Sequence, residues 1–284
     1  MADQRILRGT SAVLSWQNVD SDGEPAAPSG SVTVEVVTSD GTEVLQALTA
    51  TSGTGSDPRT VALTAADTAG LDLLTATWTD GDSEHTTTVE IVGGYYFTLA
   101  EARASDDFLA DQTKVSDEDI KVLRWAVEDE IERITNVAFV PRFRYGHVQN
   151  GTCNSILLNP YLRSIRSVSS YWGSEYTAWS ANDLTSLHID SAIGQITGYR
   201  SFAGDLLVAI EHGMDKPPPD VKAAALELLR DKAVRPWDAI NARATSYSGD
   251  EQGTVDLAPV GPWSTGLPRV DAVLDRYSMR VSIA

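Results

Sequence analysis

Residues 86–101 read TTTVEIVGGYYFTLAE, and the periodicity of the chain changes within this stretch. Up to Val92, apolar and polar residues alternate, which is typical of a β-strand with one buried face. After Gly94, Thr98 and Glu101 have the spacing of a capping box, the signal that begins a helix. The stretch therefore predicts a boundary near Gly93 between an all-β unit and a helical unit.

The unit before this boundary, residues 1–93, consists of short runs rich in Val, Thr and Leu that are separated by turn residues. Two pairs of these runs each flank a turn and predict hairpins: residues 32–37 with 44–48, and residues 73–79 with 86–92. About seven strands, with Trp16 and Trp78 as expected core residues, predict an immunoglobulin-like β-sandwich without a disulfide. Modules of this kind usually serve as binding or decoration domains.

The clearest helix of the second unit begins at Ser116, which forms a further capping signal with Asp119. Its apolar stripe predicts a buried face and consists of Ile120, Leu123, Val127, Ile131 and Ile134. The opposite face carries Glu128, Asp129, Glu130 and Glu132, and such a charge run usually forms a solvated surface. A functional role for these acids is the minority interpretation.

Strands return in residues 139–213. Asn150 and Gly151 predict a hairpin that joins residues 143–148 to residues 155–158, and residues 187–197 predict another. Residues 206–211 read as a buried strand. After Pro217-Pro218-Pro219, Asp220 is positioned to cap a helix that runs to about Val234.

The last part of the chain combines a long loop with an amphipathic end. Residues 236–268 are rich in Pro, Gly and polar residues, and loops of this length are normally functional arms or linkers. A helical face then carries Val270, Val273, Leu274 and Tyr277, and an alternating run carries Met279, Val281 and Ile283. This end either folds back on its own domain or docks on a partner, and the pattern leaves both alternatives open.

Together these patterns predict an α+β multidomain fold. A sandwich over residues 1–93 precedes a helical unit over residues 94–236, which contains the β insertion at about residues 139–213. Residues 237–284 form the loop and the helix-strand arm.

The composition excludes several classes of protein. The chain has 284 residues, 42% of them hydrophobic, with a formal net charge of −18 and one cysteine. The apolar fraction is sufficient for buried cores, whereas the negative charge argues against a protein that binds nucleic acid by neutralising phosphates. Cys153 alone supports neither an intrachain disulfide nor a Cys-rich zinc site.

The sequence also predicts neither a membrane span nor a secretory signal. No apolar run approaches the roughly 18 residues that a membrane-spanning helix requires, and the N-terminus lacks a basic region followed by a long apolar stretch. We therefore expect synthesis in the cytoplasm and no membrane partner.

Motifs for catalysis are missing from the sequence. The four histidines, His85, His147, His188 and His212, lack zinc-protease spacing, and there is no nucleophile elbow, phosphate loop or dinucleotide fingerprint. We therefore expect no enzyme, no cofactor and no metal. Acidic pairs such as Asp106-Asp107 are too common in this chain to identify a hydrolase, which ranks last among the alternatives.

A competing interpretation is a carbohydrate-binding or decoration protein of a virion or surface. Its candidate residues are the aromatic side chains of Tyr171, Trp172, Tyr176 and Trp179, which could stack on sugar rings or line a contact between subunits.

From residue 95 onward, several segments resemble a known family in their order and in their amino-acid sequence. The segments are residues 96–104, the helix over residues 117–136, Pro141-Arg142, Glu211-His212-Gly213, residues 217–222 and residues 266–277, which end in Val-Asp-Ala-Val-Leu-Asp-Arg-Tyr. In this order they resemble the head-to-tail connector adaptors of long-tailed, siphovirus-type bacteriophages. The resemblance covers about two thirds of the chain, and the sequence departs from the simplest members of the family by its N-terminal sandwich and by the strand-rich insertion at residues 139–213.

This resemblance implies a structural virion protein that forms a ring, twelve-fold in the family, below the portal at the neck. The ring would join the DNA-filled head to the tail and line part of the DNA exit channel without catalysing a reaction. Its partners would be the portal, a stopper or tail-completion protein and further copies of the chain, with double-stranded DNA passing through unbound. The portal-docking residues carried over from the family are Val270, Val273, Leu274, Tyr277, Val281 and Ile283.

The charge of the chain agrees with such a role, because an acidic channel repels phosphates. A ring of acidic subunits needs local ion pairs at its interfaces. We expect these pairs to join a neighbour's carboxylates to Arg124, Arg133, Arg142 or Arg144, and the candidate channel-facing acids are Glu128, Asp129, Glu130 and Glu132.

Overall fold

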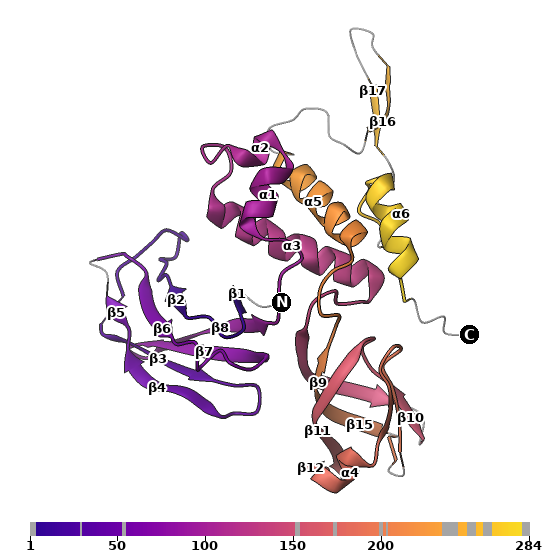
Figure 1. Ribbon diagram of the computed structural model, residues 1–284. Helices are drawn as coiled ribbons and strands as arrows, with labels where there is room; N and C mark the ends of the chain where they lie inside the picture. Colours follow the sequence, from indigo (N-terminus) through magenta and orange to yellow (C-terminus); the bar gives the residue numbers. More distant parts are fainter. Residues whose placement is uncertain are drawn as a thin grey trace.

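A computed structural model shows the α+β multidomain fold that the sequence predicts. It describes residues 4–28, 30–52, 55–150, 154–172, 175–198, 201–202, 204–234, 244–248, 254–257 and 263–279. Figure 1 shows an N-terminal pair of sheets, a group of helices and a second β unit, with a thin two-stranded arm beyond the helices.

The N-terminal unit is a sandwich of two sheets. The first sheet has the order β1-β8-β7-β3-β4 and the second the order β2-β6-β5. Their bounds are β1 (Gln4–Leu7), β2 (Ala12–Trp16), β3 (Val32–Val37), β4 (Glu43–Thr49), β5 (Thr51–Ser52), β6 (Arg59–Leu63), β7 (Asp72–Asp80) and β8 (Ser83–Val92). Both predicted hairpins, β3 with β4 and β7 with β8, are confirmed.

The core of the sandwich follows from the alternation of its strands. Val32, Val34 and Val36 point inward and are buried, since successive strand side chains point to opposite faces. Trp78 is also buried, and its ring stacks on that of Trp16 with centroids 6.3 Å apart.

Five of the six helices in the described parts of the chain form the middle unit. They are α1 (Leu99–Ser105), α2 (Asp107–Ala110), α3 (Asp117–Thr135), α5 (Pro219–Val234) and α6 (Pro268–Tyr277). The capping boxes predicted at Thr98 and Ser116 are both present. Asn136 ends α3 in the left-handed conformation, which Asn adopts more readily than most residues.

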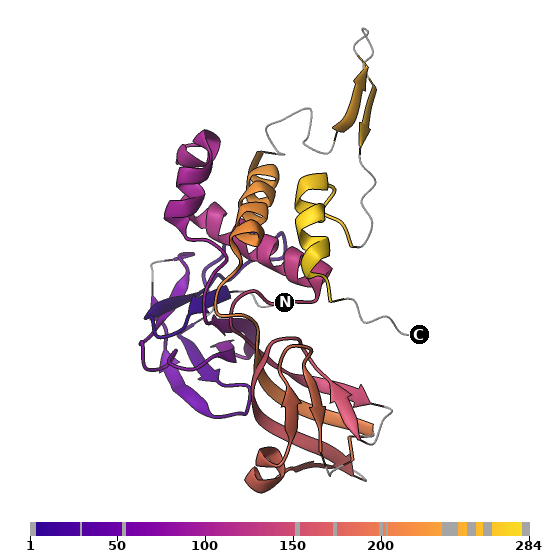
Figure 2. The same ribbon diagram turned by 45° about the vertical axis from the view of Figure 1, so that its right-hand side comes forward.

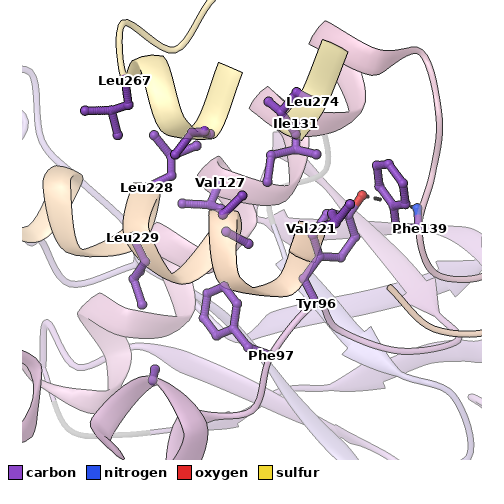
Figure 3. Packing of buried hydrophobic residues seen from close by; sticks show 14 of the residues in the cluster. Tyr96, Phe97, Val127, Ile131, Phe139, Val221, Leu228, Leu229, Leu267 and Leu274 are labelled. Carbon is purple, nitrogen blue, oxygen red and sulfur yellow. Dashed lines mark hydrogen bonds between the residues drawn. The ribbon is translucent and has the colours of Figure 1, made fainter. Parts of the chain in front are cut away.

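The helices pack around one apolar cluster, shown in Figure 3. The predicted stripe of α3 faces this cluster, with Val127 and Ile131 beside Val221 and Leu228 of α5. Leu274 of α6 completes the packing, so segments from residue 96 to residue 279 share one core.

The second β unit is inserted between α3 and α5. Its strands are β9 (Arg142–Asn150), β10 (Ser155–Leu157), β11 (Leu162–Trp172), β12 (Glu175–Ala178), β13 (His188–Asp190), β14 (Gln195–Thr197) and β15 (Gly204–His212), and α4 (Ala181–Thr185) lies between β12 and β13. One sheet has the order β12-β11-β15-β9 and the other the order β10-β14-β13. The predicted strand over residues 206–211 and the hairpin β13 with β14 are confirmed.

The hairpin predicted at Asn150-Gly151 is wrong. β9 pairs with β15 along its whole length, from Arg142 opposite His212 to Asn150 opposite Gly204, and β10 pairs with β14. The long pairing of β9 with β15 buries Val208 and Ile210 in the core of this unit, and a local turn signal carries no information about such a distant partner.

Residues 244–248 and 254–257 form two strands where the sequence predicts a loop. β16 (Ala244–Ser248) and β17 (Thr254–Leu257) pair with each other and with no other described strand. Figure 1 and Figure 2 both show this pair projecting away from the helices, beyond α6. We call it the β16–β17 arm.

Candidate functional site

The three units meet at a cluster of charged side chains, which we call the charged junction. Its members are Arg5 of β1, Glu90 of β8, Glu128, Asp129 and Glu132 of α3, and Arg142 of β9. The cluster therefore joins the sandwich, the helices and the second β unit through their side chains.

Arg142 is the central cation of the junction. Its Nη2 donates to a carboxylate oxygen of Glu128 at 2.8 Å and to one of Glu132 at 2.9 Å, and its Nε donates to Glu132 at 3.0 Å. The side chain of Arg142 is 2% exposed and that of Glu128 is fully buried. Buried charges persist only when they are paired and hydrogen-bonded. Arg142 and Glu128 are paired in this way, although the buried Nη1 of Arg142 has no hydrogen-bond partner.

Arg5 supplies the second cation. Its Nε donates to Glu90 at 2.7 Å and its Nη1 to Glu128 at 3.3 Å, while its Nη2 contacts Asp129. Glu128 thus accepts from two arginines that lie far apart in the sequence. This shared carboxylate connects the first strand of the sandwich to the second β unit.

Backbone and tyrosine groups complete the junction. The amide of Tyr96 donates to Glu128 at 2.9 Å, its hydroxyl donates to Glu132 at 3.0 Å, and that hydroxyl accepts from the amide of Phe139 at 3.2 Å (Figure 3). Burial raises the pKa of Tyr96 well above its usual value, so this hydroxyl stays a donor. The helical core and the junction therefore share one tyrosine.

Burial and charge act in opposite directions on the carboxylates. Burial disfavours the charged form of Glu90, but the cations Arg142 and Arg5 outweigh burial and lower its pKa. Burial raises the pKa of Glu132, and Arg142 opposes that shift. Each of these acids is committed to arginines of the same chain, which is the arrangement of a structural network.

His212 lies beside this network at the end of β15. Its Nδ1 is buried without a hydrogen-bond partner. Burial, together with the neighbouring cations Arg144 and Arg142, lowers the pKa of His212 to about 4. The imidazole is therefore neutral near pH 7.

The acidic face of α3 is not the solvated surface that its charge run suggests. Glu128, Asp129 and Glu132 belong to the junction, and Glu130 pairs with Lys232 of α5 at 2.6 Å. The sandwich, the second β unit and α5 cover these residues within one chain. This placement differs from the expected one facing a channel.

The four candidate arginines fall into two groups. Arg124 and Arg142 are buried within the chain, at 5% and 2% exposure, which differs from the expected position at a subunit interface. Arg133 and Arg144 are exposed, and the Nη1 of Arg144 donates to Asn159 at 2.6 Å. Only the exposed pair is positioned to contact another subunit.

The C-terminal helix folds back on its own domain, one of the two alternatives left open. Val270 and Leu274 are fully buried, and Val273 packs against the same cluster. The ring of Tyr277 packs edge-on against Phe139 with centroids 5.5 Å apart, and its hydroxyl donates to Asp220 of α5 at 2.9 Å. Asp220 lies in the first turn of α5, and its carboxylate also accepts from the amide of Val221 at 2.9 Å.

Two residues of the expected docking set are fully buried in these contacts. Val270 and Leu274 hold α6 to α3 and α5, so neither side chain is available to a partner. Val281 and Ile283 lie outside the described residues.

Structural roles account for the acidic pairs and for Trp179. Asp106 caps α2, where it accepts from the amide of Phe108 at 2.9 Å, and Asp119 belongs to the capping box of α3. Trp179 is 7% exposed in the core of the second β unit and is therefore unavailable to a sugar ring. Tyr171 is exposed beside Tyr176, with ring centroids 5.1 Å apart; Cys153 and the side chain of Trp172 lie outside the described residues.

The described parts of the chain contain neither a membrane-spanning helix nor a cluster of metal ligands. None of the helices described there is long and apolar enough to cross a membrane. The same residues contain no group of three or more side chains that could hold a metal ion.

Comparison with known proteins gives a likeness to solved structures. No family model matches the chain, and no curated protein matches it. A chain of the solved neck of an empty GTA particle, computed with C6 symmetry, matches with a TM-score of 0.44 and 16% sequence identity. The match covers 66% of this chain and 93% of the other.

Proposed function

We propose that the chain is a structural protein of a bacteriophage neck, a head-to-tail adaptor that forms a ring below the portal. The ring joins the DNA-filled head to the tail and carries out no reaction. In the virion the ring contacts the portal on one side and a stopper or tail-completion protein on the other. The chain is synthesised in the host cytoplasm.

The observation that carries this proposal is the meeting of the family-like segments in one domain. The segments around Tyr96, Pro141, Asp220 and Tyr277 are far apart in the sequence. Yet Tyr96 packs on Phe139 with ring centroids 5.8 Å apart, Phe139 packs on Tyr277, and the hydroxyl of Tyr277 reaches Asp220. The sequence segments that resemble the adaptor family therefore pack together in one core.

The remaining parts fit additions to that core. The sandwich and the second β unit are both attached at the charged junction, on the same side of α3 (Figure 2). In an adaptor ring they would decorate the neck or strengthen contacts between subunits. The net charge of −18 suits a channel that passes DNA without holding it.

The buried positions in α6 change where docking on the portal is to be sought. Because Val270 and Leu274 belong to the core, we assign docking to the residues that follow α6. Val281 and Ile283 alternate there with polar residues, which is the pattern of a segment that adds a strand to a partner.

The test is co-sedimentation of the purified chain with portal-bearing, DNA-filled heads. The truncated variant ends at Met279, since a truncation after Gly266 would remove α6 from the core. We expect saturable binding by the full chain, loss of binding on truncation, and loss with Val281→Asp but not with the neighbouring control Ser282→Asp.

Two outcomes would contradict the proposal in different ways. Absence of full-length binding, under conditions where a known neck protein binds, would overturn the adaptor function. Full binding by the truncated chain would keep the adaptor function and remove the assignment of docking to the last residues.

A further inference from the structure

A cleft of about 530 Å³ lies between the sandwich and the helices. Its walls come from β1 and β2 on one side and from α1 and the first half of α3 on the other. Val13, Leu99 and Trp125 line it together with three cations, Arg5, Lys121 and Arg124, and one acid, Glu118, which pairs with Lys121 at 2.9 Å. The cleft is separate from the core of the charged junction, although Arg5 borders both.

Arg124 is the unusual residue of this cleft. It is 5% exposed, and its guanidinium carbon lies 3.5 Å from the ring centre of Tyr95. Its Nη1 donates to the carbonyl of Phe97 at 3.3 Å, whereas its buried Nε has no hydrogen-bond partner. Among the described residues it forms no ion pair, in contrast to Arg5 and Arg142.

A second donor in the cleft is also unsatisfied. The indole Nε1 of Trp125 is buried without a partner. Burying a guanidinium without an opposite charge and leaving donors unpaired are both unfavourable. Burial lowers the pKa of Arg124 and outweighs the opposing effect of Tyr95 and Glu128, while Arg5 and Arg142 act in the same direction as burial. Two buried donors of the cleft, the Nε of Arg124 and the Nε1 of Trp125, therefore lack an acceptor.

The β-strands that border the cleft are edges. β1 pairs only with β8, and β2 pairs only with β6, among the described strands. Val13 of β2 lines the cleft and is 57% exposed. Exposed edges pair readily with extended segments of other chains, so the occupant that fits this cleft is an extended, acidic segment.

The β16–β17 arm has the complementary properties. A two-stranded sheet alone is at best marginally stable in water, so the arm needs a surface to pack on. Residues 244–257 contain Asp250, Glu251 and Asp256 and no Lys, Arg or His. Asp250 and Glu251 fall between the two strands in the sequence.

The arm and the cleft lie on opposite sides of the helical domain. The helices α1, α5 and α6 follow one another across Figure 1 and Figure 2, and the arm projects beyond α6. The cleft is on the side of α1 and β1. A contact between unlike surfaces of identical subunits is head-to-tail, and such contacts close into rings when the rotation permits.

We infer that the cleft between β1, β2 and α3 receives the acidic β16–β17 arm of a second copy of the chain, with Arg124 as the countercharge. The inference rests on the proposed ring and names the contact that joins its neighbouring subunits. Carboxylates of the arm would accept from Arg124 and Trp125, while its backbone follows the free edge of β1 or β2.

The experiment uses a fluorescently labelled peptide with the sequence of residues 244–257, titrated into the full chain. We expect saturable binding by fluorescence anisotropy that weakens as salt is added, because the contact is partly ionic. Arg124→Gln should weaken binding at least about tenfold, equivalent to about 1.4 kcal/mol. Arg133→Gln, an exposed position on the same helix, is the matched control and should leave binding unchanged.

A second pair of variants guards against loss of folding in Arg124→Gln. Val13 is exposed in the wall of the cleft, so Val13→Glu and Val13→Lys differ only in the charge that the arm meets. Val13→Glu should weaken the peptide and Val13→Lys should strengthen it. A peptide in which Asp250 and Glu251 are replaced by Asn and Gln should bind less tightly than the native peptide.

The outcomes separate this inference from the proposed function. No binding of the native peptide, or binding equal for Val13→Glu and Val13→Lys, would overturn the inference even if the full chain binds heads. Peptide binding with the expected charge dependence, together with no binding of the full chain to heads, would support the contact and overturn the adaptor function.

Discussion

Replacing Arg142 with Met tests whether the charged junction holds the three units together. The substitution keeps most of the volume of the side chain but removes its hydrogen bonds to Glu128 and Glu132, which span 2.8 to 3.0 Å. Removing one partner of a buried ion pair costs about 3–5 kcal/mol, because the opposite charge stays buried and unpaired. We expect Arg142→Met to lower the free energy of unfolding by this amount at pH 7, compared with a typical total of about 5–15 kcal/mol.

The pH dependence of this loss gives the prediction its second part. Burial already raises the pKa of Glu132 above its ordinary 4.5, and Arg142 opposes that shift. Without Arg142 the folded-state pKa rises further above the unfolded value, so the penalty is largest at pH 7. It declines as the pH falls toward 4.5, where both states become protonated. The loss measured at pH 5 should therefore be smaller than the loss at pH 7.

Urea unfolding followed by tryptophan fluorescence measures both quantities. Arg133→Met is the control, an exposed arginine of α3, the helix that carries Glu128 and Glu132, and should change the free energy of unfolding by no more than about 0.5 kcal/mol. Glu132→Gln combined with Arg142→Met should show a coupling of about 1–3 kcal/mol, because the two residues are in direct contact. A loss below about 1 kcal/mol at pH 7, or a loss that does not change with pH, would refute the assignment of Arg142 as the buried countercharge of α3.

Three further predictions concern the same domain. His212→Gln should flatten the fall in unfolding free energy between pH 6.5 and 4. The histidine stays neutral down to a pKa of about 4 in the folded chain but takes up a proton below 6.5 in the unfolded chain. An unchanged pH profile would show that His212 is charged in the folded chain. Gly213→Ala should destabilise the folded chain by about 2–4 kcal/mol in thermal unfolding. Gly213 has φ +98°, and a Cβ there would lie 2.2 Å from the carbonyl oxygen of Val140. In the control Gly146→Ala the added Cβ meets nothing within 4 Å, so its effect should be far milder. Leu274→Ala should cost about 2–5 kcal/mol and raise hydrogen exchange in α6, and equal exchange in the variant and the native chain would contradict the docking of α6 on the core.

Local signals in the sequence predicted the elements whose partners are near in the chain. Thr98 and Ser116 begin helices as their capping boxes indicate, and the turns after residues 37 and 79 join neighbouring strands. The apolar stripe of α3 is buried because its spacing sets one face of the helix. In each case the information needed lies within one element or two consecutive elements of the chain.

The errors arise where a distant partner decides the outcome. Asn150-Gly151 is a good turn sequence, but β9 finds its partner in β15, more than fifty residues later. Glu128 reads as a surface residue in its helix, and its burial depends on Arg5 and Arg142 from two sheets. The unpaired state of Arg124 has no sequence signal at all, because an arginine on a helix usually reaches solvent or a nearby acid.

The way in which the second β unit joins the chain has a consequence for how such proteins diversify. Arg142 and His212 are paired at its entrance and exit, and the next amide, of Gly213, donates to Tyr161 while that of Met214 donates to Ala138. The polypeptide thus leaves the helical frame and returns to it at one place. A whole module can be exchanged at such a point without rerouting the frame.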